Sequence, residues 1–139
     1  MIILSESICS KVNNRFVVHE HRAIRAGLHH DIRLGKDCVL KSWATRKLPD
    51  LIDNKTKRIM LFPTPDHSPD WIDFSGEITD KYGKGQVSIW DSGSYKIIKW
   101  DDDGKKIINF KGSKIQGNFA IIPYKEKYLM LRMKSGEKK

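Results

Sequence analysis

Short runs of apolar residues, separated by turn-forming residues, make up most of this chain of 139 residues. Most of the runs are rich in β-branched or aromatic residues, which favour strands over helices. They cover residues 15–21, 28–34, 38–44, 58–62, 71–74, 86–90, 94–100, 105–110, 119–122 and 128–133. Many short strands at hairpin spacing are typical of an antiparallel sheet that closes into a barrel or folds as a sandwich.

The intervening segments contain the residue types that turns require. Asp, Ser, Gly and Lys are common in these segments, at residues 91–94, 101–104, 111–114 and 124–127. Residues 45–51 predict a basic loop, and the prolines of residues 63–69 predict a rigid one. A helical turn or two fits residues 48–57, whereas residues 3–12 match no single element. We therefore expect a mainly β fold: a small closed or partly open antiparallel β-barrel with one or two short helices.

The length of the chain fits one domain, residues 1–139, with a polar tail at residues 134–139 that we expect to fray. Lys and Arg number 26 against 17 Asp and Glu, which gives a formal net charge of +9. Such a charge attracts polyanions, and nucleic acid is the first candidate. A lysine-rich surface explains the net charge equally well. The net charge therefore indicates a nucleic-acid partner only when a candidate binding or catalytic site supports it.

Cys9 and Cys38 are the two cysteines of the chain, and their spacing matches no zinc motif. We expect neither a disulfide framework nor a structural zinc site, which fits a reducing cytoplasm. The apolar run at residues 1–4 is too short for the core of a signal peptide, and no stretch reaches transmembrane length. The sequence predicts a soluble, intracellular protein without membrane contacts.

Candidate chemistry is concentrated in the first two predicted strands, which hold four of the five histidines of the chain. Side chains alternate between the two faces of a strand. In residues 28–34, His29, Asp31 and Arg33 therefore share one face. His30 falls on the apolar side of the same strand.

The preceding strand alternates in the same way. In residues 15–21, His19 and His21 share the face opposite the apolar residues. His29 and Asp31 can reach one ion, and His21 from the neighbouring strand completes a set of two histidines and one carboxylate, which suits a divalent transition metal. Such a site leaves coordination positions open for water or a substrate. Taken singly, a histidine such as His19 or His30 is more often a surface or hydrogen-bonded core residue than a functional one.

Positively charged and titratable groups accompany these ligands. Arg33, one pleat further along, can hold two oxygens of a phosphate with its planar guanidinium. His67 lies in the proline-rich loop, where its imidazole can donate a proton or a charged hydrogen bond to a phosphate. Lys41, Arg46 and Lys47 can follow a nucleic-acid backbone. Metal ligands beside an arginine point to phosphoryl chemistry.

The tryptophans leave two interpretations open. Trp43 or Trp71 can stack on a base or a sugar of a nucleic acid. A small barrel also needs large side chains to fill its core, and this is the more frequent use of tryptophan. The sequence alone does not choose between the two.

Several motifs, in order along the chain, resemble the 3′-phosphoesterase domain of bacterial DNA ligase D and its free-standing archaeal and bacterial relatives. The motifs are found at residues 21–33, 39–44, 66–67, 73–76, 82–85 and 89–93, and more weakly at residues 112–121 and 128–131. Several ordered motifs are more specific than any one of them. Residues 1–14 form an N-terminal arm that matches the family weakly.

This resemblance implies a manganese-dependent enzyme that trims damaged or ribonucleotide 3′ ends. It would act as a phosphodiesterase and then as a phosphomonoesterase, and leave a 3′-hydroxyl for repair and ligation. Other divalent transition metals fit the same ligands. The resemblance implies that His21, His29 and Asp31 bind the metal, and that Arg33 and His67 are catalytic residues that contact the phosphate.

The chain also departs from the family that it resembles. His19 stands where the family has a glutamine that helps to hold phosphate, and Trp71 stands where it has an active-site tyrosine. The stretch between His21 and His29 is two residues longer than is usual in the family, so a wider loop has to bring His21 to the metal. These departures predict an activity that is weakened or that favours one of the two reactions.

The implied substrates are DNA or RNA–DNA 3′ ends in a primer-template, and the implied partners are a separate ligase, polymerase or end-binding protein. The expected setting is a prokaryotic cytoplasm, at the nucleoid, with the chain acting as a monomer. Two other functions stay open. A non-haem Fe(II) oxygenase uses the same ligand set, and a non-catalytic nucleic-acid-binding barrel explains the charge without the histidines.

Overall fold

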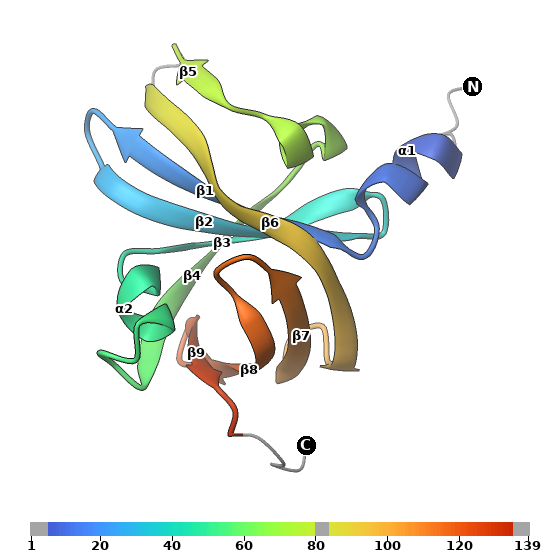
Figure 1. Cartoon of the computed structure of the whole chain (residues 1–139), viewed down its shortest axis with the longest axis vertical. Coiled ribbons are helices and arrows are strands. Elements are labelled where there is room, and N and C mark those ends of the chain that lie inside the picture. Colours follow the sequence, from blue (N-terminus) through green and yellow to red (C-terminus); the bar gives the residue numbers. More distant parts are fainter. Residues whose placement is uncertain (1–5, 80–83, 135–139) are drawn as a thin grey trace.

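Eight antiparallel strands close into a barrel, which confirms the predicted mainly β fold (Figure 1). The structure is a computed structural model that describes residues 6–79 and 84–134, except the side chains of residues 6–8. The strands of the barrel are β1 (Arg15–Ala23), β2 (Gly27–Lys36), β3 (Val39–Thr45), β4 (Arg58–His67), β9 (Lys127–Arg132), β8 (Gln116–Tyr124), β7 (Lys106–Gly112) and β6 (Gly85–Trp100). Pairing between β6 and β1 closes the ring.

One further strand and three helical segments lie outside the barrel wall in the described part of the chain. They are α1 (Glu6–Val12), α2 (Leu48–Ile52), the 3₁₀ helix η1 (Pro69–Asp73) and β5 (Gly76–Ile78). The expected short helices are thus present as α1 and α2. β5 pairs with the first part of β6 and extends the sheet beyond the barrel (Figure 1).

The barrel encloses the main hydrophobic core. Because side chains alternate along each strand, one face of every barrel strand points inward. The ring centroids of Phe16 and Phe110 lie 5.0 Å apart and those of Phe110 and Phe119 lie 5.7 Å apart, both edge to face. This arrangement of aromatic rings adds to the stability that burial supplies. Trp43 is buried in the same core, so it serves mainly in packing.

A second apolar cluster lies on the outer face of β1 to β3, next to α1 and η1. It consists of the buried residues Val12, Val17, Leu40 and Ile72, with Trp71 packed against it. Val17 shares a face with the histidines of β1, because residues two apart in a strand point the same way. The cluster therefore fixes η1 beside the histidine-bearing face of the sheet.

Residues 71–74 do not form the predicted strand, because they belong to η1 and to the residue that ends it. Pro69 opens this turn, where its missing N–H costs nothing. The Oγ atom of Ser68 accepts a hydrogen bond from the N–H of Asp70. Local capping thus outweighs the strand preference of the aromatic residues that follow.

The loop predicted for residues 63–69 is wrong in its first part, because β4 continues to His67. β4 pairs with β9 only as far as Leu61, and beyond that point it pairs with β3 alone. Its later part is therefore an edge strand, in which a proline does not have to donate a backbone hydrogen bond. This edge position explains how Pro63 and Pro65 fit into a strand.

The turn predicted at residues 91–94 is also wrong, because β6 runs through it as one strand. The buried carboxylate of Asp91 accepts hydrogen bonds from the backbone N–H groups of Ser113, Lys114 and Ile115, at 2.8 to 3.0 Å. Asp91 thus ties β6 to the turn between β7 and β8 instead of turning its own strand.

Cys9 and Cys38 form a disulfide, so the expectation of no disulfide is wrong. Cys9 lies in α1, and Cys38 lies between β2 and β3, 29 residues away in the sequence. The spacing of the cysteines carries no information about this contact, since it arises only when α1 packs across the outer face of the sheet. The N–H of Cys38 also donates to Asn13 Oδ1 at 3.1 Å, which ties the same two segments together.

No helix within residues 6–79 and 84–134 is long and apolar enough to cross a membrane. Part of the expected N-terminal arm, residues 1–5, and most of the tail expected to fray, residues 135–139, lie outside the described residues. The same holds for residues 82 and 83 of the motif at 82–85.

Candidate metal and phosphate site

The pairing register of β1 and β2 assembles the predicted ligands. His21 lies directly opposite His29, and His19 lies opposite Asp31. Residues that face each other in antiparallel strands project their side chains from the same face of the sheet. This is the outer face of the barrel wall, since the alternate residues of both strands fill the core. The shared face predicted from the alternation is confirmed.

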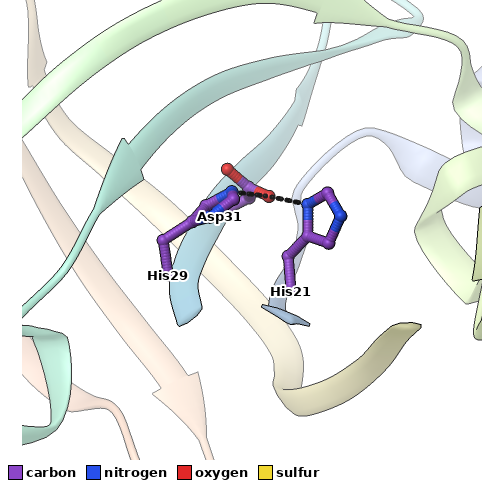
Figure 2. A group of neighbouring side chains, drawn as sticks. All are labelled: His21, His29 and Asp31. Carbon is purple, nitrogen blue, oxygen red and sulfur yellow. Dashed lines mark ion pairs between the residues drawn. The ribbon is translucent and has the colours of Figure 1, made fainter. Parts of the chain in front are cut away.

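Two histidine side chains of this face converge on the carboxylate of Asp31 (Figure 2). Asp31 Oδ2 lies 3.3 Å from His29 Nε2 and 3.8 Å from His21 Nδ1. One ligand atom from each of the three residues lies within 4.8 Å of the others. Two imidazoles and a carboxylate at this spacing form a donor set that a divalent transition metal accepts.

Asp31 is a buried carboxylate. Burial by itself raises the pKa of Asp31, but the hydrogen bond from His29 and the charge of Arg33 outweigh it, and the pKa is lowered. The carboxylate is therefore ionised at neutral pH, as a metal ligand has to be.

The guanidinium of Arg33 is held from three directions. Its Nε donates to His19 Nδ1 at 3.0 Å, its Nη1 donates to Ser42 Oγ at 3.1 Å, and its Nη2 donates to Asp31 Oδ2 at 3.4 Å. The residue is 4% exposed, and its Cζ lies 5.5 Å from the ring centroid of Trp71. Burial lowers the pKa of Arg33 while Asp31 opposes the shift, and an arginine stays charged in a protein. The result is a cation with a fixed orientation.

His19 is fully buried behind Arg33. Its Nε2–H donates to the carbonyl oxygen of Phe74 at 2.9 Å, while its Nδ1 accepts from Arg33, so the ring is neutral. Burial and then the charge of Arg33 lower the pKa of His19 to about 4. His19 lies outside the lining of the pocket and supports Arg33, and its contact with phosphate stays a prediction.

A pocket of about 500 Å³ opens beside these groups. Its lining comes from the outer face of β1 and β2, from β4, and from the segment that contains η1 and β5. The lining residues are His21, Asp31, Arg33, Thr64, His67, Trp71, Phe74, Ile78 and Thr79. The structure thus brings His67 and Trp71, predicted from a distant part of the sequence, to the candidate metal ligands.

His67 and Trp71 touch at this pocket, with ring centroids 5.3 Å apart. The Nδ1–H of His67 donates to the carbonyl of Pro65 at 2.9 Å, which leaves Nε2 as the unprotonated nitrogen of the neutral ring. Burial and then the charge of Arg33 lower the pKa of His67, so the neutral ring prevails at pH 7. Trp71 does not fill the barrel core, since it packs against the outer apolar cluster and lines the pocket. Its stacking on a base or a sugar stays a prediction.

The three residues predicted to follow a nucleic-acid backbone lie outside the lining of this pocket. Lys41 Nζ pairs with Asp66 Oδ2 at 3.0 Å. Arg46 donates to the carbonyl of Ala26 in the turn between β1 and β2, at 2.8 Å, and to the carbonyl of Leu28 near the start of β2, at 3.1 Å, and so braces the longer loop that follows His21. Lys47 is exposed at the start of α2. Their contact with nucleic acid stays a prediction.

Sequence reasoning missed Ser42, Phe74 and Ile78. Ser42 lies opposite Arg33 in the register of β2 and β3, so a correct strand pairing would have indicated it. Phe74 contributes a backbone carbonyl, which no side-chain pattern reveals. Ile78 belongs to β5, a strand of three residues that is too short to show alternation.

Comparison with known proteins points to one family. The sequence profile of the DNA ligase D 3′-phosphoesterase domain matches residues 19–123. The chain is 42% identical over 113 residues to the multifunctional non-homologous end joining DNA repair protein LigD of Mycobacterium tuberculosis, which covers 78% of this chain and 14% of that protein. It is 37% identical over 134 residues to the multifunctional non-homologous end joining protein LigD of Mycolicibacterium smegmatis, which covers 88% of this chain and 17% of that protein. The chain thus spans less than a fifth of the length of these relatives.

Proposed function

Because this chain belongs to the DNA ligase D 3′-phosphoesterase domain family, we propose that it is a Mn²⁺-dependent phosphoesterase that trims DNA 3′ ends. Its substrates would be 3′-terminal ribonucleotide diesters and 3′-phosphates, and its product a 3′-hydroxyl. The observation that carries the proposal is the convergence of two histidines and Arg33 on Asp31, beside the pocket. A metal site next to a fixed guanidinium suits an anionic ester.

His21, His29 and Asp31 are the residues that would hold the metal ion. They fit it because the carboxylate is ionised and the three ligand atoms lie close together. When bound, the ion would act as a Lewis acid that withdraws charge from the phosphate. Titration with several divalent ions distinguishes Mn²⁺ from the other transition metals that accept this donor set.

Arg33 would bind and orient the phosphate. The bonds from Arg33 to its three neighbours use three of the five N–H groups that a guanidinium carries, and the group faces the pocket. Further N–H groups can then donate to the non-bridging phosphate oxygens, where charge increases in the transition state. A donor that is already oriented stabilises this charge without further reorganisation.

His67 would handle the proton of the attacking water. Its neutral ring carries the proton on Nδ1, so Nε2 can accept a proton while the water oxygen bonds to phosphorus and the leaving oxygen departs. The leaving oxygen then takes up a proton from solvent water, and His67 returns its proton to solvent. The lowered pKa of His67 favours this role over the donor roles that the sequence left open, because a donor has to be protonated at pH 7.

The setting of this activity is part of the proposal. The net charge of +9 supports a nucleic-acid substrate. The relatives are multifunctional end-joining proteins, which supports a ligase, polymerase or end-binding protein as a partner. We place the protein as a monomer at prokaryotic DNA, in the cytoplasm, on the basis of its bacterial end-joining relatives. The Cys9–Cys38 disulfide removes the argument from reduced cysteines.

A primer-template with a 3′-terminal ribonucleotide or a 3′-phosphate tests this function. With Mn²⁺ the wild type is expected to convert both to a 3′-hydroxyl, and EDTA to stop the reaction. Asp31→Asn and Arg33→Lys are each expected to lower kcat/KM by about 100-fold or more. Asp31→Asn removes the negative charge of a metal ligand, and Arg33→Lys removes the planar guanidinium that donates to two phosphate oxygens. Asp53→Asn, an exposed position at the end of α2, is the matched control that keeps activity.

Other results would select the alternative functions. Oxygen consumption that depends on Fe(II), without phosphate release, would indicate an oxygenase. Salt-sensitive DNA binding without metal uptake or turnover would indicate a non-catalytic binding barrel. Full activity of a folded Asp31→Asn variant would contradict the metal site.

A further inference from the structure

Two large apolar side chains are exposed where β1 turns into β2. Ile24 is 71% exposed and Leu28 is 45% exposed. β1 ends two residues after His21, and β2 begins two residues before His29. The hairpin tip, defined as residues 22–28, therefore adjoins the candidate metal ligands, and it reaches the margin of the molecule (Figure 1).

Single exposed apolar residues are common on proteins, so the surroundings of this pair decide what it can do. Four exposed cationic residues lie in or against the hairpin tip: Arg22, Arg25, Arg46 and Lys84. Glu20 Oε1 pairs with Arg22 Nη2 at 3.2 Å, and such an exposed pair is weak enough to exchange for a phosphate. Apolar side chains that enter between bases, beside cations that hold the phosphates, are typical of proteins that unstack DNA.

The hairpin tip is held in place by hydrogen bonds from two sides. Arg46 donates to the carbonyls of Ala26 and Leu28, at 2.8 and 3.1 Å. On the other side, the N–H of Ile24 donates to the carbonyl of Lys84 at 2.9 Å. A tip that is ordered before it meets a ligand loses little entropy on binding.

The two faces of the hairpin present different groups. His21 and His29 face each other in the register and project from the outer face of the barrel wall. Arg22 and Leu28 also face each other, and they project from the opposite face, since side chains alternate along a strand. A strand that ends at the metal ligands and a strand that passes along Arg22 and Leu28 would therefore lie on opposite sides of the hairpin.

We propose that the hairpin tip opens the last base pairs of a DNA duplex. The strand with the 3′ end reaches the candidate metal ligands, and the complementary strand passes along the opposite face of the hairpin. Ile24 and Leu28 cover the bases that lose their stacked neighbours, and the cations hold the phosphates. The inference rests on the proposed function and adds base-paired 3′ ends to its substrates.

The fluorescence of 2-aminopurine measures strand opening without turnover. This base analogue is placed in the template, opposite the 3′-terminal nucleotide of the primer, and its fluorescence rises when it loses its stacked neighbours. In EDTA, saturation with the wild type is expected to raise the fluorescence, whereas Ile24→Ser with Leu28→Ser is expected to bind the DNA without this rise. An analogue deep inside the duplex is the control. No rise with the wild type, or an equal rise with the double variant, would overturn the inference.

Kinetics with Mn²⁺ supplies a second test. Two primer-templates carry the same 3′ end, which is either paired or mismatched over its last bases. In the double variant, the ratio of the two kcat/KM values, paired over mismatched, is expected to fall about tenfold, because a mismatched base costs least to open. Activity on the mismatched end is expected to persist, which shows that the variant is folded.

Phe62→Ser with Tyr124→Ser is the matched control, because these side chains are about as exposed as Leu28 and lie outside the pocket lining. An unchanged ratio in the hairpin variant, or an equal loss on both ends, would overturn the inference and leave the proposed function intact. A rise in fluorescence without turnover of any 3′ end would support the role of the hairpin and contradict the proposed function.

Discussion

The protonation state of His19 is coupled to the hydrogen bond that orients Arg33. The Nδ1 atom of His19 accepts that bond. A proton on Nδ1 would turn this acceptor into a second donor facing the Nε–H of Arg33, and the hydrogen bond would be lost. The pKa of His19 is lowered from 6.5 to about 4. As the pH falls below 6.5, the unfolded chain takes up this proton before the folded one does. The free energy of unfolding therefore decreases between pH 6.5 and pH 4.

We expect His19→Gln to lose this part of the pH dependence. A glutamine can donate to the carbonyl of Phe74 and accept from Arg33 without titrating. Urea unfolding of both proteins in EDTA, at pH 7 and pH 4, measures the effect. The wild type is expected to lose about 2–3 kcal/mol more than the variant over this interval. Equal losses would show that His19 already titrates normally in the folded protein.

Alternation along single strands was enough to predict which side chains of the site share a face. It placed His29, Asp31 and Arg33 together, and it placed His21 on the matching face of the neighbouring strand. It did not reveal that His19 supports Arg33, because that role depends on a carbonyl far away in the sequence. A period of two residues fixes the direction of a side chain but not its partner across the fold.

At the scale of the elements, the Cys9–Cys38 disulfide was not predicted from the sequence. It joins α1 to the turn between β2 and β3. Replacing both cysteines, Cys9→Ser with Cys38→Ser, is expected to lower the free energy of unfolding by about 3–4 kcal/mol, since the bridge closes a loop of this length. Urea unfolding of the oxidised wild type and of the double variant measures the difference.

Reduction of the wild type by dithiothreitol is expected to produce the same loss and to leave the double variant unaffected. Val12 stays buried and Asn13 still accepts a hydrogen bond without the bridge, so both proteins are expected to remain folded. Equal stability of the oxidised and the reduced wild type would contradict a stabilising role of the bridge.

Errors in the predicted elements have local physical causes. Prolines argued against a strand at residues 63–69, yet they fit where β4 pairs on one side only. Turn-forming residues argued for a break at residues 91–94, yet the Asp91 carboxylate binds backbone groups of another turn. In both places pairing across the fold outweighs the local preference. A single sequence does not show such pairings.

At the scale of the whole molecule, the sequence predicted an antiparallel barrel but not how it closes. Closure depends on the pairing of β1 with β6, two strands that are far apart in the sequence. This pairing also places β5 beside the candidate metal ligands, and the outer apolar cluster holds η1 there. The site is therefore a consequence of the complete fold, although its ligands lie on one hairpin.

The net charge of +9 predicts how DNA binding responds to salt. In EDTA, the affinity for a fluorescent primer-template is expected to fall linearly with salt on logarithmic axes, with a slope of about −0.9 for each phosphate contacted. Lys47 is exposed at the start of α2, and the sequence predicts that it contacts the DNA backbone. Lys47→Ser should then reduce the magnitude of the slope by about one, equally for different DNA sequences. Lys125→Ser, exposed between β8 and β9, is the matched control. The same slope in Lys47→Ser as in the wild type would show that Lys47 does not contact the DNA backbone.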